Sequence, residues 1–254
     1  MLYRSTCDLF IRSYWKDLEW LSYCLASIQK YCREFRSVIV VLPQSSAAWL
    51  RRMDLSAGSS STDIRFAFCR DYPDDYLGQQ ATKMLADTFT DADYICHVDS
   101  DCVFRRLTTP NHLIDQDRPR VMKRSRDELG RHYPWREPTE RFLGWTVRDD
   151  FMQQPPFTFP RWLYSGLREH AVLTHGVDME RYIEAQSERG FSEFNVLGAF
   201  AWQRHRERFI WVDIGSFPPI EPHCHWYWSW GGINDVIRSE ILETLGVGQA
   251  GRLR

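Results

Sequence analysis

Apolar residues in the first part of the chain form short continuous runs separated by stretches with helical spacing. Residues 7–11 and 38–43 are mostly apolar runs, which is typical of strands covered on both faces. Between them, residues 18–31 place apolar side chains at every third or fourth position. This spacing predicts a helix with one buried face, and Asp17 stands where its N-cap is expected.

The same alternation continues to residue 104. Residues 64–68 predict a third strand, residues 77–89 a helix and residues 93–98 a fourth strand. Strands that alternate with helices in this way favour a parallel, doubly wound α/β arrangement. The first part of the chain is therefore predicted to belong to the α/β class.

The pattern after residue 104 is less regular. Residues 120–123 and 209–212 predict strands, and helices are expected at 162–173, 178–189, 193–206 and 233–245. Residues 125–160 are polar, aromatic and proline-containing, which favours a loop-rich region. A length of 254 residues without a Gly/Ser/Pro-rich linker predicts a single domain.

Two carboxylates follow the fourth predicted strand. Asp99 and Asp101 are two residues apart, so in extended backbone both side chains face the same side. Two such charges repel unless a cation lies between them, and Mg²⁺ or Mn²⁺ prefers oxygen ligands and substrate phosphates. The pattern predicts a metal that holds a phosphorylated substrate; two solvated aspartates at a strand end are the alternative.

Composition narrows the function classes. The formal net charge of −2 at pH 7 argues against bulk electrostatic capture of nucleic acid. Seven scattered cysteines without a C-x-x-C favour reduced, buried thiols and a cytoplasmic location. The sequence shows neither a signal-peptide pattern nor an apolar run of the roughly 18 residues that a transmembrane helix needs, so no transmembrane segment is expected. Peripheral contact with a membrane remains compatible with the sequence.

Five short motifs in a fixed order resemble those of the GT-A-type glycosyltransferases, and most closely a little-described bacterial and viral group. They are residues 10–14 (FIRSY), 79–83 (QQATK), 97–104 (HVDSDCVF), 192–194 (SEF) and 228–232 (WSWGG). The resemblance spans nearly the whole chain. It implies a Rossmann-like mixed sheet flanked by helices within one domain, residues 1–254. Residues 7–104 would form the nucleotide-binding half and residues 105–254 the acceptor half with a C-terminal metal-ligand tail.

The resemblance also implies an activity. The chain would transfer a sugar from a UDP- or GDP-type nucleotide-sugar donor to a glycan or glycolipid acceptor, with Mn²⁺ or Mg²⁺, in polysaccharide synthesis. The residues expected to bind the donor are Arg12, Ser13, Tyr14, Gln80, Lys83, Asp99 and Ser100. Tyr14 could stack on a base, and Lys83 could offset phosphate charge. The alternative for residues 12–14 is an ordinary polar loop, and the alternative for Gln80 and Lys83 is a solvated helix face.

Further ligands and a base must come from elsewhere in the chain. The resemblance implies a C-terminal histidine beside Asp99 and Asp101 on the metal, so His223 and His225 are the candidates. An inverting transfer also needs a carboxylate that accepts the acceptor's proton. Glu193 is the main candidate for this role, and Asp150 is the second.

Two other functions compete with sugar transfer. An apolar strand followed by D-x-D-x-V also describes haloacid-dehalogenase-like phosphatases, in which Asp99 would be the nucleophile. That motif normally follows the first strand, and here it follows the fourth. A non-catalytic carbohydrate-binding protein would explain the eleven tryptophans, but not the aspartate pair or Lys83.

Overall fold

The computed structural model describes residues 5–51, 62–125, 127, 133–215 and 221–247. The strands are β1 (Cys7–Arg12), β2 (Ser37–Pro43), β3 (Asp63–Cys69), β4 (Tyr94–His97), β5 (Cys102–Phe104), β6 (Ile114–Asp115), β7 (Arg118–Ser125), β8 (Asp149–Asp150), β9 (Phe157–Pro160), β10 (Ile210–Asp213) and β11 (Cys224–Trp226). The α-helices are α1 (Leu18–Tyr31), α2 (Ala47–Leu50), α3 (Asp75–Met84), α4 (Pro110–Leu113), α6 (Arg136–Leu143), α7 (Trp162–His175), α8 (Met179–Glu184), α9 (Glu193–Arg204) and α10 (Asp235–Leu245).

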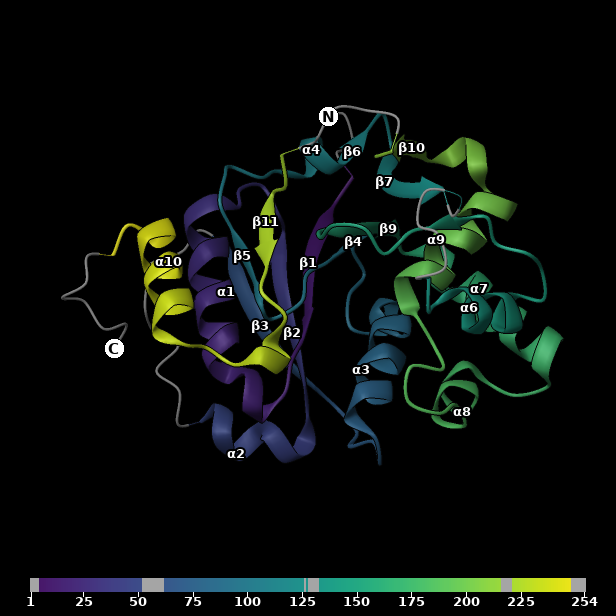
Figure 1. The fold of residues 1–254 in the computed structure, drawn as a ribbon, viewed down its shortest axis with the longest axis horizontal. Coiled ribbons are helices and arrows are strands. Elements are labelled where there is room, and N and C mark those ends of the chain that lie inside the picture. Colours follow the sequence, from purple (N-terminus) through teal and green to yellow (C-terminus); the bar gives the residue numbers. More distant parts are fainter. Residues whose placement is uncertain (1–4, 52–61, 126, 128–132, 216–220, 248–254) are drawn as a thin grey trace.

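The main sheet has the strand order β3-β2-β1-β4-β9 (Figure 1). Its first four strands are parallel, and β9 pairs with β4 in the antiparallel direction. The chain moves outward from β1 to β3 and then returns to the other side of β1 for β4. A mixed sheet flanked by helices confirms the predicted α/β class. The change of direction also leaves a switch point between β1 and β4, which is where ligands bind in such sheets.

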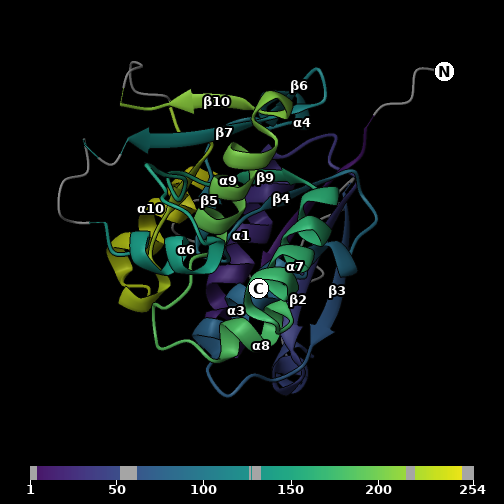
Figure 2. The same ribbon diagram turned by 90° about the vertical axis from the view of Figure 1, so that its right-hand side faces the viewer.

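Alternate residues of the central strands supply two separate cores. Leu9 and Ile11 pack with α1 on one face of the sheet, while Phe10 packs with α3, α7 and α9 on the other. This follows from the two-residue period of a strand. Figures 1 and 2 show α1 and α10 on one side of the sheet and α3, α7, α8 and α9 on the opposite side.

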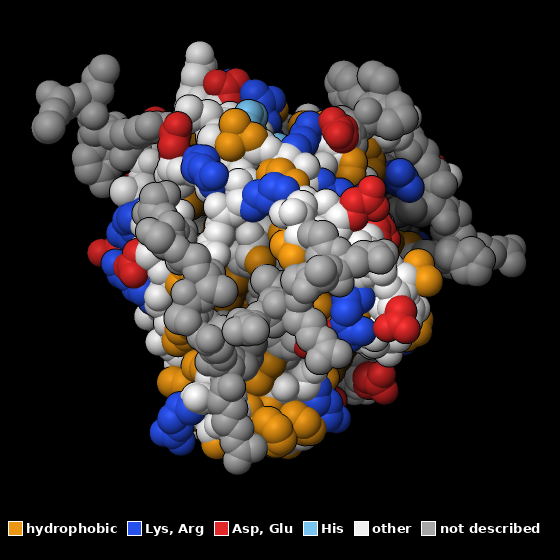
Figure 3. Space-filling model, turned by 90° about the vertical axis from the view of Figure 1, so that its left-hand side faces the viewer, with side chains coloured by type: hydrophobic (Ala, Val, Ile, Leu, Met, Phe, Trp, Pro, Cys, Tyr) orange, Lys and Arg blue, Asp and Glu red, His pale blue; other side chains and the backbone are white. Residues whose placement is uncertain are grey.

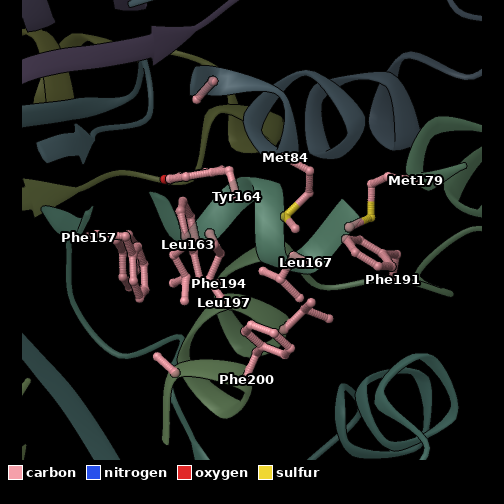
Figure 4. Packing of buried hydrophobic residues seen from close by; sticks show 14 of the residues in the cluster. Met84, Phe157, Leu163, Tyr164, Leu167, Met179, Phe191, Phe194, Leu197 and Phe200 are labelled. Carbon is pink, nitrogen blue, oxygen red and sulfur yellow. The ribbon is translucent and has the colours of Figure 1, made fainter. Parts of the chain in front are cut away.

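Aromatic and aliphatic side chains from several helices fill the larger core (Figure 4). The rings of Phe157 from β9 and Phe194 from α9 are stacked, with centroids 3.9 Å apart. Met84 of α3 and Leu167 of α7 belong to the same cluster. This packing fixes the start of α9 against both the sheet edge and α3.

Helix α10 covers α1 and is joined to the rest of the molecule by surface ion pairs. Arg238 of α10 donates to Glu19 of α1 over 2.8 Å, and Arg105 after β5 pairs with Glu240. On this face, acidic and basic side chains lie beside one another among hydrophobic ones (Figure 3). Among the described residues, no helix has the length and hydrophobicity needed to cross a membrane.

The region 125–160 is more ordered than predicted. It contains α6, β8 and β9. Helix α6 is mostly polar and buries only one stripe, which includes Phe142 and Leu143, so its apolar signal is short. Strand β9 carries Pro160 at its end, which favoured a loop. Because β9 is the last strand of the sheet, its proline removes no necessary ladder hydrogen bond.

Replacement of Gly198 by Ala should destabilise the protein by about 1–3 kcal/mol, because the site has no room for a methyl group. A Cβ at Gly198 would lie 2.4 Å from the Cβ of Phe151. Gly166 in α7 is the matched control, since its nearest neighbour would be Phe200 Cε1 at 3.6 Å. Gly166→Ala should instead stabilise the helix by up to about 1 kcal/mol. Urea unfolding measures both, and equal effects would contradict the close approach.

Candidate functional site

The candidate site lies where β1 and β4 end side by side. Phe10 of β1 is paired with His97 of β4, and the N–H of Val98 donates to the Phe10 carbonyl over 3.0 Å. Ser13 therefore follows one strand and Asp99 follows its neighbour, at the switch point of the sheet. Because both strands are parallel, their carboxyl ends open towards the same edge.

Lys83 joins three elements at this edge. Its Nζ lies 2.6 Å from Asp99 Oδ1 and 2.9 Å from Glu193 Oε1. The Lys83 side chain is 3% exposed and that of Glu193 is 4% exposed. Burial alone would lower the pKa of Lys83, but the charges of Asp99 and Glu193 outweigh it and raise the pKa above its ordinary value. The ion pairs thus link α3, the end of β4 and the start of α9.

Asp101 is buried and receives only part of the hydrogen bonding that a carboxylate can accept. Its Oδ2 accepts from the backbone N–H of Ser229 over 2.6 Å, while Oδ1 is buried with no hydrogen-bond partner. Burial and the nearby charge of Asp99 raise the pKa of Asp101 to about 6. The carboxylate therefore has an oxygen available for a donor or a cation.

A backbone turn brings the C-terminal tail to Asp101. The N–H of Tyr227 donates to the Asp101 carbonyl over 3.1 Å, continuing the antiparallel pairing of β5 and β11. Trp228 then adopts a φ of 60°, which is uncommon for a side chain of this size. This conformation turns the chain so that Ser229, the next residue, can donate to the carboxylate.

Asp17 adds a third carboxylate that the sequence did not identify as part of a site. It occupies the predicted N-cap position of α1 but makes no capping hydrogen bond through its side chain. Burial, with the charge of Asp101 as the next cause, raises its pKa to about 7, while a hydrogen bond with Ser229 acts in the opposite direction. Asp17 and Asp101 thus face the same turn of the tail.

These raised pKa values predict a pH dependence of stability. In the folded protein Asp17 titrates near 7 and Asp101 near 6, whereas unfolded aspartates titrate near 4. The folded state therefore retains protons that the unfolded chain releases. The resulting stabilisation is complete below about pH 4 and is lost as pH rises through the folded values.

We expect the Tm measured in the presence of a chelator to fall between about pH 4 and about pH 8. The double variant Asp17→Asn/Asp101→Asn should flatten this part of the curve relative to the wild type. Scanning calorimetry across the range provides the measurement. Parallel curves for the two proteins would show that these carboxylates do not titrate as described.

The residues expected to bind the nucleotide differ from one another in their contacts and burial. The terminal nitrogens of Arg12 bind the carboxylate of Asp75 at the start of α3, so Arg12 ties β1 to that helix. Ser13 is buried and its hydroxyl has no partner. Tyr14 is partly buried beside the same edge, and burial followed by the charge of Asp17 raises its pKa. Ser100, which lies between Asp99 and Asp101 in the sequence, is also buried.

Gln80 holds the segment that precedes Glu193. Its Nε2 donates to the Phe191 carbonyl over 3.0 Å, and its Oε1 is buried without a partner. Gln80 and Lys83 are three residues apart on α3, so they lie on one helical face. Both contact the chain at residues 191–193, which places α9 relative to α3.

The two candidate catalytic carboxylates have different partners. Glu193 Oε1 accepts from Lys83 Nζ, and its Oε2 is buried without a hydrogen-bond partner. Asp150 accepts from the Met152 N–H and from Gln153 Nε2. Burial raises the pKa of Asp150, and a hydrogen bond from Asn195 acts against this.

Asn195 positions the start of α9. Its Oδ1 accepts from the Tyr133 hydroxyl and the Phe151 N–H, both over 2.8 Å. Its Nδ2 donates to the hydroxyl of Ser192. Asn195 was not predicted from the sequence, in which its position two residues after Glu193 is the one signal available.

His223 lies apart from the aspartate pair. Arg106 donates to its Nε2 over 3.1 Å, and its Nδ1 lies 2.9 Å from the Thr108 hydroxyl. Since Arg106 has no acceptor, Nε2 must accept, and both ring nitrogens are occupied. Burial, Arg106 and His112 lower the pKa of His223 to about 4. Along the β11 ladder it stands four residues, or about 13 Å, before Tyr227.

His225 is the nearer of the two expected metal ligands. It pairs with Val103 in the ladder, two residues before Tyr227, and its ring packs against the Tyr227 ring with centroids 4.2 Å apart. Burial and Arg105 lower its pKa. The contact that the tail makes with the aspartates runs through Ser229, so the expected histidine ligation stays a prediction.

The donor set at Asp99 and Asp101 suits a hard divalent cation, although the described residues form no cluster of three or more His, Cys, Asp or Glu in reach of one ion. The free Oδ1 of Asp101 is the feature that fits such an ion best. Asp99 already faces Lys83. The remaining ligands would therefore have to come from substrate oxygens and water, which is usual for Mg²⁺.

Searches for similar proteins add no family assignment: no model of a known protein family matches the chain, and no curated protein was found to be similar to it.

Proposed function

We propose that the protein is a divalent-metal-dependent glycosyltransferase that uses a nucleotide-diphosphate sugar. The observation that carries the proposal is the position of Asp99 and Asp101 at the switch point of the sheet, with Oδ1 of Asp101 buried and unpartnered. A nucleotide bound across this edge would meet Ser13 and Tyr14 at the end of β1. Its diphosphate would then face the carboxylates and Lys83.

The residues divide the chemistry between them. A divalent cation held by Asp101 and Asp99 would supply Lewis-acid stabilisation of a diphosphate leaving group. Lys83 stays charged, since Asp99 and Glu193 raise its pKa, and so it adds positive charge close to the same group. Glu193 holds Lys83 in place. Gln80 fixes the segment before Glu193 through the Phe191 carbonyl.

We assign proton acceptance to Asp150 ahead of Glu193. In an inverting transfer the acceptor oxygen forms a bond to the anomeric carbon, the bond to the diphosphate oxygen breaks, and the hydroxyl proton passes to a carboxylate. Glu193 is 3% exposed and paired with Lys83. Asp150 is less buried, and burial raises its pKa, which makes its carboxylate a stronger proton acceptor than an ordinary aspartate.

Thermal-shift screening of nucleotide sugars, with and without Mn²⁺, tests the proposal. A ligand of the folded state raises the Tm in proportion to the logarithm of its concentration over its Kd. We expect a nucleotide sugar to raise the Tm only with Mn²⁺, and Ser13→Ala to reduce that rise. No shift from any UDP- or GDP-linked sugar, with either metal, would contradict the proposal.

One contact favours a second candidate, a phosphatase that uses Asp99 as nucleophile. Lys83 Nζ lies 2.6 Å from Asp99 Oδ1, as a cation that steadies a nucleophilic carboxylate would. Such a phosphatase also needs a lysine downstream of the motif, and Lys123, which follows it most closely, is instead paired with Asp149 and Asp213. Release of phosphate from p-nitrophenyl phosphate with Mg²⁺, lost in Asp99→Asn, would favour the phosphatase. Metal-dependent binding of nucleotide sugars alone would favour the transferase.

A further inference from the structure

A cavity lies away from the aspartate pair. It has a volume of about 620 Å³ and is lined by residues after β5 and by parts of α4, β7, β9, β10 and the start of β11. Figures 1 and 2 show α4, β6, β7 and β10 together at one end of the molecule. Of its lining residues only His223 was a candidate for the metal site, and its ring contacts Arg106 and Thr108 rather than the aspartates. Its volume falls in the range of small-molecule sites.

The deep part of this cavity is apolar. Val121, Phe157 and Phe159 are 5%, 7% and 1% exposed. Ile210 and Met122 are partly buried and lie on the paired strands β10 and β7. At the opening, Leu107 is 57% exposed although it is a large hydrophobic residue. Apolar surface therefore continues from the base to the mouth, where an unbranched hydrocarbon or aromatic body would be removed from water.

The charged part of the lining has a single sign. The charged side chains that line the cavity are those of Arg106 and Arg120, and no acidic residue lines it among the residues that the structure describes. Arg120 is paired only at the surface, with Asp115 over 3.0 Å, where both side chains are more than 40% exposed. Arg106 lies 3.5 Å from Glu221, which is 80% exposed. Such exposed pairs are weak and can be exchanged for a bound anion.

Arg106 is also held in one orientation. Its terminal nitrogen donates to His223 Nε2, and its carbonyl accepts from the Thr108 hydroxyl over 3.1 Å. Its Nε is buried without a hydrogen-bond partner. The His223 ring contacts Arg106 through Nε2 and Thr108 through Nδ1, so it holds the guanidinium in place. The guanidinium is the fixed charge of the cavity.

We propose that this cavity binds an amphipathic anion, with a hydrocarbon body between β7, β9 and β10 and a phosphate or carboxylate head at Arg106 and Arg120. Apolar walls without the arginines would take a neutral ligand equally well. The arginines without the walls would take a free anion. The combination selects a ligand that carries both groups, and it does so independently of the function proposed for Asp99 and Asp101.

Isothermal titration of the full chain with three probes tests the proposal: n-decyl phosphate, inorganic phosphate and n-decyltrimethylammonium, each below its micelle-forming concentration. We expect n-decyl phosphate to bind in a saturable manner, at least about tenfold more tightly than either other probe. Arg106→Gln/Arg120→Gln should weaken it by about tenfold or more. Ile210→Trp should block the cavity and remove binding.

The controls lie outside the cavity. Arg65→Gln removes an arginine that is 59% exposed and paired with Asp63, and Val172→Trp adds a large side chain where the native residue is 52% exposed. Neither should change binding. Equal affinity for the ammonium probe, equal affinity for inorganic phosphate, or unchanged binding by the arginine double variant would each overturn the proposal. If Ile210→Trp fails to fold, the arginine double variant still tests the proposal.

Discussion

Asp101→Asn should remove the Mn²⁺-dependent Tm increase caused by a nucleotide sugar and lower transfer by at least about 100-fold, more than the loss of an outer-shell metal partner usually costs. The amide keeps an oxygen to accept the Ser229 N–H, so the fold is retained. What it loses is the negative charge of the unpartnered Oδ1. Thermal shift and transfer from the same donor measure the two effects.

The same change should stabilise the metal-free protein. Burial and Asp99 raise the pKa of Asp101 to about 6, so the ionised carboxylate costs more free energy in the folded protein than in the unfolded chain. Removing that charge should raise the free energy of unfolding by roughly 1–3 kcal/mol at about pH 8. Greater stability together with lost activity separates a ligand role from a structural one.

Asp115→Asn is the control, because Asp115 is 49% exposed and its one ion-pair partner among the described residues is Arg120. It should leave both the metal-dependent Tm increase and transfer unchanged. If Asp101→Asn retained full transfer and a normal response to Mn²⁺, Asp101 would have no part in metal binding. If it unfolded the protein, Asp101 would serve the β5–β11 connection instead.

The fold of residues 7–104 was predicted well because the central strands are buried on both faces. Strands β1, β2 and β4 are buried along their whole length, so their apolar runs are unbroken. Helices α1 and α10 have one exposed side and show clear periodicity. The signal is weaker in α6, where the buried stripe is short, and in β9, where an edge position tolerates a proline.

The site was predicted only in part, because its contacts are tertiary. The D-x-D spacing identified Asp99 and Asp101, and the same helical face identified Gln80 and Lys83. No local pattern shows that the side chain of Asp17 lies near Asp101 or that the N–H of Ser229 reaches it. Both contacts depend on how η1 (Trp15–Asp17) and η5 (Ser229–Gly231) are placed by the folded sheet.

Lys83→Met should cause the largest loss of stability of the variants considered, about 3–5 kcal/mol at about pH 7. Methionine fills a similar volume without the charge, so Asp99 and Glu193 would keep their burial and lose their cation. Glu193 is 4% exposed and Asp99 is 18% exposed at the side chain. Urea unfolding measures the change.

Lys123→Met is a matched control, since Lys123 also bridges two carboxylates, Asp149 and Asp213. Its side chain is 13% exposed and that of Asp213 is 27% exposed. Water can therefore solvate the carboxylates left without their cation better here than at Lys83. We expect a smaller loss of stability than for Lys83→Met. An equal or larger loss for Lys123→Met would contradict the role of Lys83 as the central ion-pair partner.

Acid pH should reverse part of the Lys83→Met effect, because an uncompensated carboxylate can be neutralised by a proton. The variant would take up protons on folding that the wild type does not, so its deficit should be largest near pH 8 and shrink towards about pH 4. Lys83→Met/Glu193→Gln should be more stable than Lys83→Met alone, with a coupling of about 1–3 kcal/mol. A deficit that is independent of pH, with no coupling to Glu193, would mean that Lys83 acts through the packing of its aliphatic stem rather than through its charge.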